Sequence, residues 1–179
     1  MVDRFILSIA SEYLKQGYLL NDHRLIQNVP AGLWAWSGTK LRMGFAKVED
    51  HYLWLDGNNT AITPELLTTA YRQFSEIVNR RFHVPHALRI TIPNLTVVAV
   101  SNDGFSEAVL SFARNKILNP WYGGEIGQVV LVELGNRNIV SLEELSVSGH
   151  PKPGAIALDY SAKFVRRICY TVFETQALE

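Results

Sequence analysis

The sequence has few of the features by which several classes of protein are recognised. Its single cysteine, Cys169, excludes an intrachain disulfide and makes a reducing compartment natural. No apolar run reaches the length of a transmembrane helix. Residues 1–10 lack the long apolar core and the cleavage site of a signal peptide. We therefore expect a cytoplasmic protein without a membrane partner.

Neither sign of charge is in excess. Lys and Arg number 17 together, as do Asp and Glu, which gives a formal net charge of zero. Net charge therefore gives no support to a nucleic-acid partner, although it does not exclude a local basic patch. A protein partner and a homo-oligomer both stay open. The hydrophobic fraction of 47% and the length of 179 residues predict a single folded domain over 1–179 with a sizeable core.

Several motifs of enzymes and cofactor sites are also missing. The chain has no glycine-rich GxGxxG or GxxxxGK[ST] pattern for nucleotide phosphates and no GxSxG nucleophile turn. His83 and His86 are three residues apart, but Pro85 between them disfavours the helix that would place both on one face. We interpret this segment as a linker and expect no metal or other cofactor there.

Periodic apolar residues predict four helices, over 3–16, 63–82, 105–113 and 160–173. The second has the clearest start, with Thr63 as N-cap and Pro64 at the first helical position. In the last helix Cys169 lies on the apolar stripe, which indicates a buried and unreactive thiol.

The strands are expected in two groups. Residues 32–57 predict a three-strand meander whose last turn falls at Glu49 and Asp50, with three tryptophans filling a core or an interface. The β-branched runs at 96–100 and 128–134 indicate strands buried on both faces. A stiff connection is expected at 149–154. The order of elements predicts an α/β domain, with a mixed central sheet flanked by helices on both faces.

One ligand surface is suggested by turn chemistry and by an aromatic loop. A polar turn follows the buried strand at 96–100 and opens onto a helix, which is a general place for a ligand. A loop with aromatic residues and glycines precedes the strand at 128–134, and such loops often carry function. The candidate ligand or partner residues are Ser101, Asn102, Asp103, Trp121, Tyr122 and Glu125.

The order of elements and the segment VVAVSNDGFSEAVLSFA at 97–113 resemble the restriction-endonuclease-like fold, the PD-(D/E)xK nuclease superfamily, in its Mrr-like branch. The resemblance covers residues 3 to 142. It implies a divalent metal such as Mg²⁺, held by an acid on the second strand and by an acid-x-Lys motif on the third. Lys47 matches the lysine of that motif, but Phe45 stands at the position of its acid.

Three functions follow as hypotheses. The first is a non-catalytic domain of nuclease-like fold that acts in binding or assembly. The second is a metal-dependent nuclease with displaced acids, whose catalytic residues would be Lys47, Glu49, Asp50 and Asp56. The third is a small-ligand enzyme or binder that uses the 121–125 loop.

Overall fold

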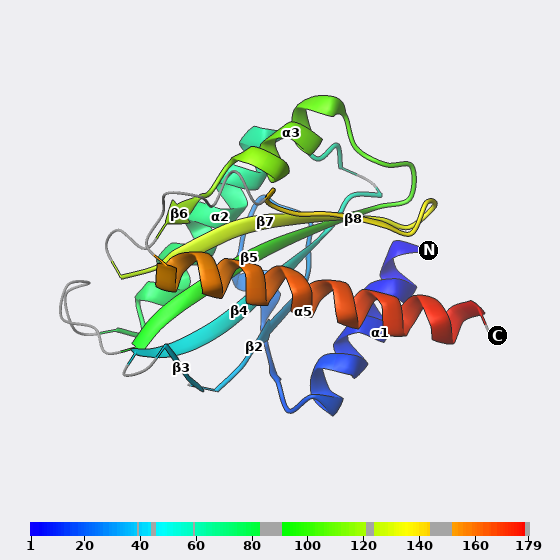
Figure 1. The fold of residues 1–179 in the computed structure, drawn as a ribbon. Coiled ribbons are helices and arrows are strands. Elements are labelled where there is room, and N and C mark those ends of the chain that lie inside the picture. The colour runs from blue at the N-terminus through cyan, green and yellow to red at the C-terminus, as the bar shows by residue number, and fades with distance from the viewer. Residues whose placement is uncertain are drawn as a thin grey trace.

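The chain folds around a mixed β-sheet covered by helices on both faces, as Figure 1 shows for the computed structural model. The structure describes residues 1–38, 40–43, 46–58, 60–82, 91–120, 124–143 and 152–177. The main path of the sheet runs β1-β2-β4-β5-β7-β6, with β3 paired to β4 and β8 paired to β7. The predicted α/β class, with a mixed sheet and helices on both faces, is confirmed.

One half of the sheet is antiparallel and consists of β1 (Leu19–Asn21), β2 (Ala31–Trp36), β3 (Lys40–Met43) and the long β4 (Ala46–Asp56). The predicted three-strand meander over 32–57 was wrong, because β2 and β3 both run antiparallel to β4 and the chain does not reverse between them. A short 3-10 helix, η1 (His23–Leu25), lies between β1 and β2. Trp34 and Trp54, which are cross-strand neighbours of Leu53 and Leu33, are both buried. These two tryptophans therefore fill the core, as predicted.

In the other half of the strand order, the central strands are parallel. β5 (Thr91–Ser101) lies between β4 and β7 (Ile126–Glu133) and runs parallel to both. Short antiparallel strands pair with β7, namely β6 (Asn119–Pro120) and β8 (Asn138–Val140). Because parallel neighbours need crossovers, α2 (Pro64–Asn79) connects β4 to β5 and α3 (Glu107–Asn115) lies between β5 and β7.

The helices form two layers. Helices α2 and α3 pack on one face of the sheet, over Leu53, Val97 and Val129. Helices α1 (Val2–Lys15) and α5 (Lys152–Ala177) pack on the other face, over Trp54, Val98 and Val130. Side chains of consecutive residues in a strand point to opposite faces, so each central strand serves both layers.

The ends of the helices follow the predicted signals. The Thr63 hydroxyl accepts a hydrogen bond from the backbone N–H of Leu66 at 3.2 Å, and so caps α2. Gly17 follows α1 with φ of +77°, a conformation that glycine adopts without steric cost, and its N–H donates to Leu14 O. Cys169 is buried in α5, and burial raises the pKa of its thiol, as expected of an unreactive cysteine.

Two boundary predictions were wrong. The pair Glu49 and Asp50 forms no turn, because both residues lie inside β4 and are buried. The last helix begins at Lys152 rather than at 160, so the predicted connection at 149–154 ends in helix. Pro153 and Gly154 signal a break in most contexts, but proline is tolerated in the first turn of a helix, where its missing N–H has no intrahelical partner.

Other predictions fall outside the described residues, namely the linker with His83 and His86 and the aromatic pair Trp121 and Tyr122. Among the helices that the structure describes, none is both long enough and apolar enough to span a membrane.

Candidate functional site

A row of polar side chains crosses the sheet beneath α5. Asp50 on β4 is the cross-strand neighbour of Asn94 on β5, and two residues further along, Tyr52, Thr96 and Gln128 face one another across β4, β5 and β7. All five are completely buried. Buried polar groups are costly unless they are hydrogen-bonded, so this row is the least typical part of the core.

The first half of the row is held by the amide of Asn94. Its Nδ2 lies 2.9 Å from Asp50 Oδ1, 2.6 Å from Ser161 Oγ and 3.2 Å from the carbonyl oxygen of Ala157. The backbone N–H of Asp50 also donates to Ser37 Oγ at 3.0 Å. These contacts fix α5 to β4 and β5 through polar rather than apolar groups.

The second half of the row leaves several polar atoms without a hydrogen-bond partner among the described residues. Gln128 Nε2 donates to the carbonyl oxygen of Leu158 in α5 at 2.6 Å, which fixes the orientation of the amide. Its Oε1 accepts no hydrogen bond from the residues that the structure describes, and neither do Thr96 Oγ1 and Asn94 Oδ1. Each such buried acceptor carries a desolvation cost of about 1–3 kcal/mol when it stays unpaired.

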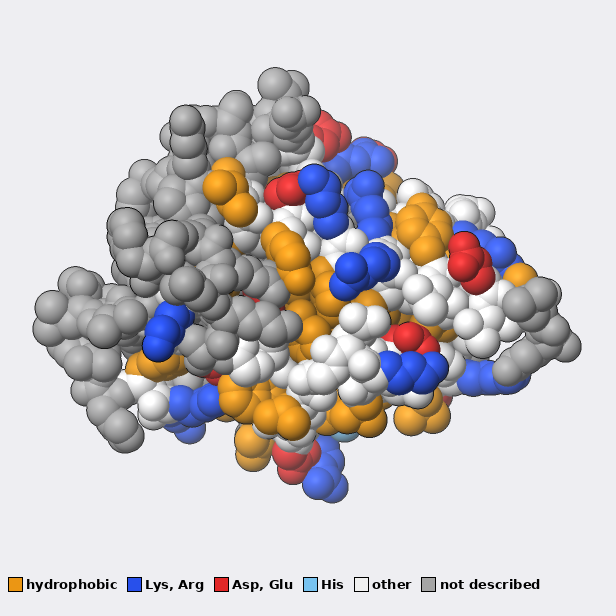
Figure 2. Space-filling view, turned by 60° about the horizontal axis from the view of Figure 1, so that its bottom comes forward, with side chains coloured by type: hydrophobic (Ala, Val, Ile, Leu, Met, Phe, Trp, Pro, Cys, Tyr) orange, Lys and Arg blue, Asp and Glu red, His pale blue; other side chains and the backbone are white. Residues whose placement is uncertain are grey.

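A cleft of about 560 Å³ lies above Gln128, between the first half of α5 and the β7–β8 edge of the sheet. Its lining combines apolar residues with hydrogen-bonding and charged groups, which include Gln128, Ser141, Leu142, Asp159, Lys163 and Arg166. Figure 2 shows Lys and Arg side chains gathered beside hydrophobic side chains on the face that carries α5. Such a mixture is typical of small-molecule sites.

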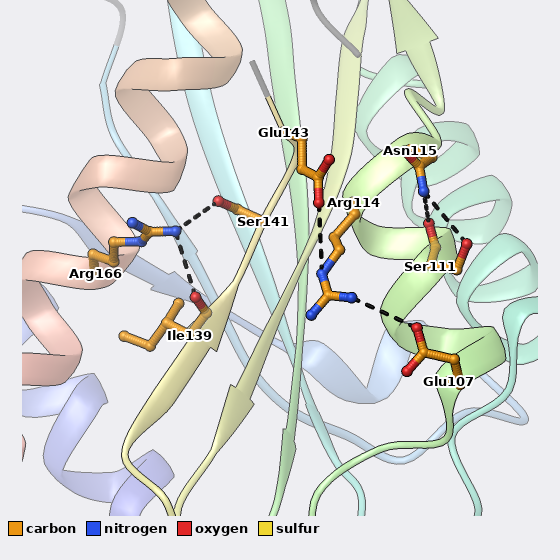
Figure 3. Close-up of polar contacts among 8 residues, drawn as sticks. All are labelled: Glu107, Ser111, Arg114, Asn115, Ile139, Ser141, Glu143 and Arg166. Atoms are coloured by element: carbon orange, nitrogen blue, oxygen red, sulfur yellow. Dashed lines mark hydrogen bonds and ion pairs between the residues drawn. The ribbon is translucent and has the colours of Figure 1, made fainter. Parts of the chain in front are cut away.

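Arg166 gives the cleft a positive charge that no carboxylate of the described residues neutralises. As Figure 3 shows, its side chain reaches from α5 to the end of β8, where Nη2 lies 3.1 Å from Ser141 Oγ and 3.4 Å from the carbonyl oxygen of Ile139. Both acceptors are uncharged. Arg114, on the α3 side of the same strand, instead lies 3.6 Å from Glu107 and 3.8 Å from Glu143.

The opposite face of the sheet holds two further polar clusters beneath α2. In the first, Glu49 Oε1 lies 3.0 Å from His51 Nε2 and 3.3 Å from Arg81 Nη2. The other imidazole nitrogen of His51, Nδ1, accepts a hydrogen bond from Trp34 Nε1 at 3.3 Å, so the proton of the neutral ring lies on Nε2. Burial lowers the pKa of His51, against the opposing effect of Glu49. Arg81 in turn stacks over Trp36, 4.4 Å from the ring centroid.

In the second cluster, the buried carboxylate of Glu125 accepts hydrogen bonds from three neutral donors on α2. These are the hydroxyl of Tyr71, the hydroxyl of Ser75 at 2.7 Å and the amide of Asn79. Burial and the neighbouring carboxylate raise the pKa of Tyr71, which keeps it a donor. Tyr71 lies directly on Gly127 of β7, where any added Cβ would approach the ring to 2.2 Å.

The residues predicted for a nuclease site do not lie together. Lys47, Glu49 and Asp50 all belong to β4, where Lys47 is exposed while Glu49 faces α2 and Asp50 faces α5. Asp56 is about 20 Å further along the strand than Asp50, at a rise of about 3.3 Å for each of six residues. Its carboxylate accepts the N–H of Asn58 at 2.8 Å, and burial, together with nearby Asp3, raises its pKa.

This arrangement does not fit the divalent metal that the nuclease resemblance implies. A shared metal needs several carboxylates at one point, at metal–oxygen distances of about 2.0–2.6 Å. Within the part of the chain that the structure describes, no group of three or more His, Cys, Asp or Glu side chains lies in such an arrangement. We therefore derive no step through a metal ion.

Ser101 and Glu125, which belong to the same predicted ligand surface, lie at opposite ends of the parallel strands. Ser101 pairs with Glu133 at the carboxyl ends of β5 and β7, whereas Glu125 precedes the start of β7. A side chain of the protein itself already occupies this turn. Glu133 Oε1 accepts the N–H of Phe105 at 3.3 Å, so a carboxylate of the protein already lies before the start of α3.

Asn102 and Asp103 complete this turn without forming a visible site. The Asn102 amide donates to Asn58 Oδ1 at 2.8 Å, and the N–H of Asp103 donates to Ser101 Oγ at 3.3 Å. Gly104 has φ of +86°, and a Cβ at that position would lie 3.0 Å from Glu133 Oε1. Asn58 and Glu133 thus hold the turn from outside it, while Asn102 Oδ1 accepts no hydrogen bond from the described residues.

Comparison with known proteins gave no match among protein-family models, curated proteins or solved structures.

The residues of the cleft were not predicted from the sequence. Arg166 and Lys163 fall in the helix expected at 160–173 but were not singled out, and Gln128 was expected only as the start of the buried strand at 128–134. One signal was present. Asn94, Thr96 and Gln128 interrupt the apolar stretches of β5 and β7 at positions that face the same side of the sheet.

Proposed function

We propose that this chain is a binding domain of nuclease-like fold that holds a small organic anion in the cleft between α5 and the β7–β8 edge. The observation that carries the proposal is Arg166, whose guanidinium borders the cleft with only uncharged partners. Lys163 lines the same cleft and adds a second cation, offset in part by its ion pair with Asp159 at 2.8 Å.

Geometry favours a compact ligand. Guanidinium has five N–H donors in a planar fork and binds carboxylates and phosphates with two parallel bonds. The two contacts of Arg166 both involve Nη2, so the other nitrogens stay available to a ligand. Leu142 and Ile156 give the cleft a partly apolar lining, and an apolar lining strengthens the attraction between opposite charges.

The residues that stand at the nuclease positions support binding rather than metal chemistry. Strand β2 contains no acidic residue. Lys47 on β4 stands at the lysine of the acid-x-Lys motif, but Phe45 occupies the position of its acid. Asp50 is sealed beneath α5 and hydrogen-bonded to Asn94.

Calorimetric titration with inorganic phosphate, acetate and citrate tests the proposal. We expect at least one anion to bind, with an affinity that falls as salt is added. Arg166→Gln should weaken binding by at least about 10-fold, as expected when a charged hydrogen bond is lost. Arg72→Gln is the matched control, because Arg72 is exposed on α2, which covers the other face of the sheet.

Two outcomes would overturn the proposal. The first is that none of the three anions binds at millimolar concentration. The second is that binding is equally strong in the parent protein, Arg166→Gln and Arg72→Gln.

A further inference from the structure

The floor of the cleft carries chemistry that a simple anion does not use. Gln128 lines the cleft from β7, and its side chain is completely buried. Because Nε2 is held by the carbonyl oxygen of Leu158, the amide cannot turn over without placing two oxygens face to face. Its Oε1 is therefore fixed as an acceptor that no described residue satisfies.

This acceptor distinguishes between classes of ligand. A carboxylate or a phosphate oxygen is repelled by Oε1, whereas a hydroxyl or an ammonium group can donate to it. Lys163 and Arg166 disfavour an ammonium group in the same cleft, and Asp159, the acidic lining residue, is already paired with Lys163. The donors that remain are neutral, and among these a hydroxyl group is the one that can also accept a hydrogen bond.

Ser141 supplies a second group that can pair with a ligand hydroxyl, in this case as a donor. It lies just after β8, is nearly buried, and accepts from Arg166 through Oγ, and its own hydroxyl hydrogen is donated to none of the described residues. A ligand hydroxyl can accept this hydrogen. The cleft thus places an anion-binding cation next to one fixed acceptor and one hydroxyl.

We infer that the ligand is a hydroxylated organic acid, such as a sugar acid, with its carboxylate on Arg166 and a hydroxyl group on Gln128 Oε1. This inference rests on the proposed function, since it concerns the same cleft. Because Oε1 is buried, contact requires a side-chain rearrangement around Leu158, of the kind that commonly accompanies binding. A site built to pair a hydroxyl group discriminates strongly against an analogue that lacks it.

Gluconate and hexanoate are suitable probes, because they share a carboxylate and six carbons but differ in hydroxyl groups. We expect the parent protein to bind gluconate at least about 30-fold more tightly than hexanoate, measured by calorimetric titration. Gln128→Met keeps the length of the side chain and removes the acceptor, and should reduce this ratio to about 3-fold or less. Gln27→Met is the control, because Gln27 is exposed and distant from the cleft.

The outcomes separate the two proposals. If phosphate, citrate or hexanoate binds through Arg166 but gluconate gains nothing over hexanoate, the hydroxylated-ligand inference is overturned and the proposed function stands. An unchanged ratio in Gln128→Met also overturns the inference. If no anion binds at all, both fail. The ratio in the parent protein decides the matter even where Gln128→Met does not fold.

Discussion

The two faces of the sheet treat their buried polar groups differently. Beneath α2, the carboxylate of Glu125 receives three donors, and Glu49 lies between His51 and Arg81. Beneath α5, Asn94, Thr96 and Gln128 each leave an acceptor that no described residue satisfies. Satisfied networks rigidify a core, whereas unsatisfied groups in a native structure call for a functional explanation. The α2 face therefore serves stability, and the α5 face has the character of a site.

Replacement of Glu125 by leucine should have the largest effect on stability. Glu125→Leu removes the acceptor of the hydroxyls of Tyr71 and Ser75, whereas the Asn79 amide keeps its hydrogen bond to Ser75 O at 2.8 Å. Each unsatisfied donor costs about 1–3 kcal/mol, so we expect a loss of about 3–4 kcal/mol in the free energy of unfolding. Urea denaturation measures it. A loss below about 1 kcal/mol would show that this cluster does not anchor α2.

Gly127→Ala tests the same anchor sterically. The new Cβ would lie 2.2 Å from the Tyr71 ring, so Tyr71 must move and give up its bond to Glu125. We expect a loss of about 2–3 kcal/mol by urea denaturation, in the range of overpacked cores. Gly38→Ala is the control, because no heavy atom lies within 4 Å of a Cβ there. Equal stability of both variants would contradict the close packing of Tyr71 on Gly127.

Acid should weaken the α2 face through His51. Burial lowers the pKa of His51 in the folded protein, so the unfolded chain binds this proton first. The contribution of His51 to stability is therefore present above its unfolded pKa of about 6.5 and is lost as the pH falls below that value. At 1.36 kcal/mol per pH unit, the loss between pH 6.5 and pH 5 is at most about 2 kcal/mol.

Comparison of unfolding at pH 7.5 and pH 5 in the parent protein and in His51→Gln checks this prediction, because the difference cancels all other titrating groups. Glu49, Asp50 and Arg81 all influence His51 and are present in both proteins. An identical pH dependence in the two proteins would rule out His51 as its source.

Gln128→Leu should have the smallest effect on stability. It removes one hydrogen bond, to Leu158 O, but also removes a buried acceptor that has no described partner. The two effects oppose each other, so we expect a change within about 1 kcal/mol. Urea denaturation of Gln128→Leu and Glu125→Leu under the same conditions measures the difference between the two faces of the sheet. Equal large losses in both variants would erase the difference between the two faces.

Local signals in the sequence were sufficient for much of the fold. The cap at Thr63 and the apolar stripes predicted the helices, and the β-branched run at 96–100 predicted the central strand. The site depends on contacts that local signals do not encode. Gln128 on β7 and Arg166 on α5 are separated by 38 positions in the sequence. They lie together at the cleft only because the chain returns after β8 and places α5 beside β7. Glu49 and Asp50 misled because adjacent acids are typical of solvated turns, whereas here tertiary partners make their burial tolerable.

The contact between α1 and α5 has a consequence for how the chain folds. Phe5 and Phe173 stack with their ring centroids 5.3 Å apart, although they lie near opposite ends of the sequence. During synthesis, α1 emerges from the ribosome first and must wait for α5 before its apolar face is covered. Contacts of such high sequence separation raise the contact order and slow folding. Until then, the exposed α1 and the bare sheet face are natural clients for a chaperone.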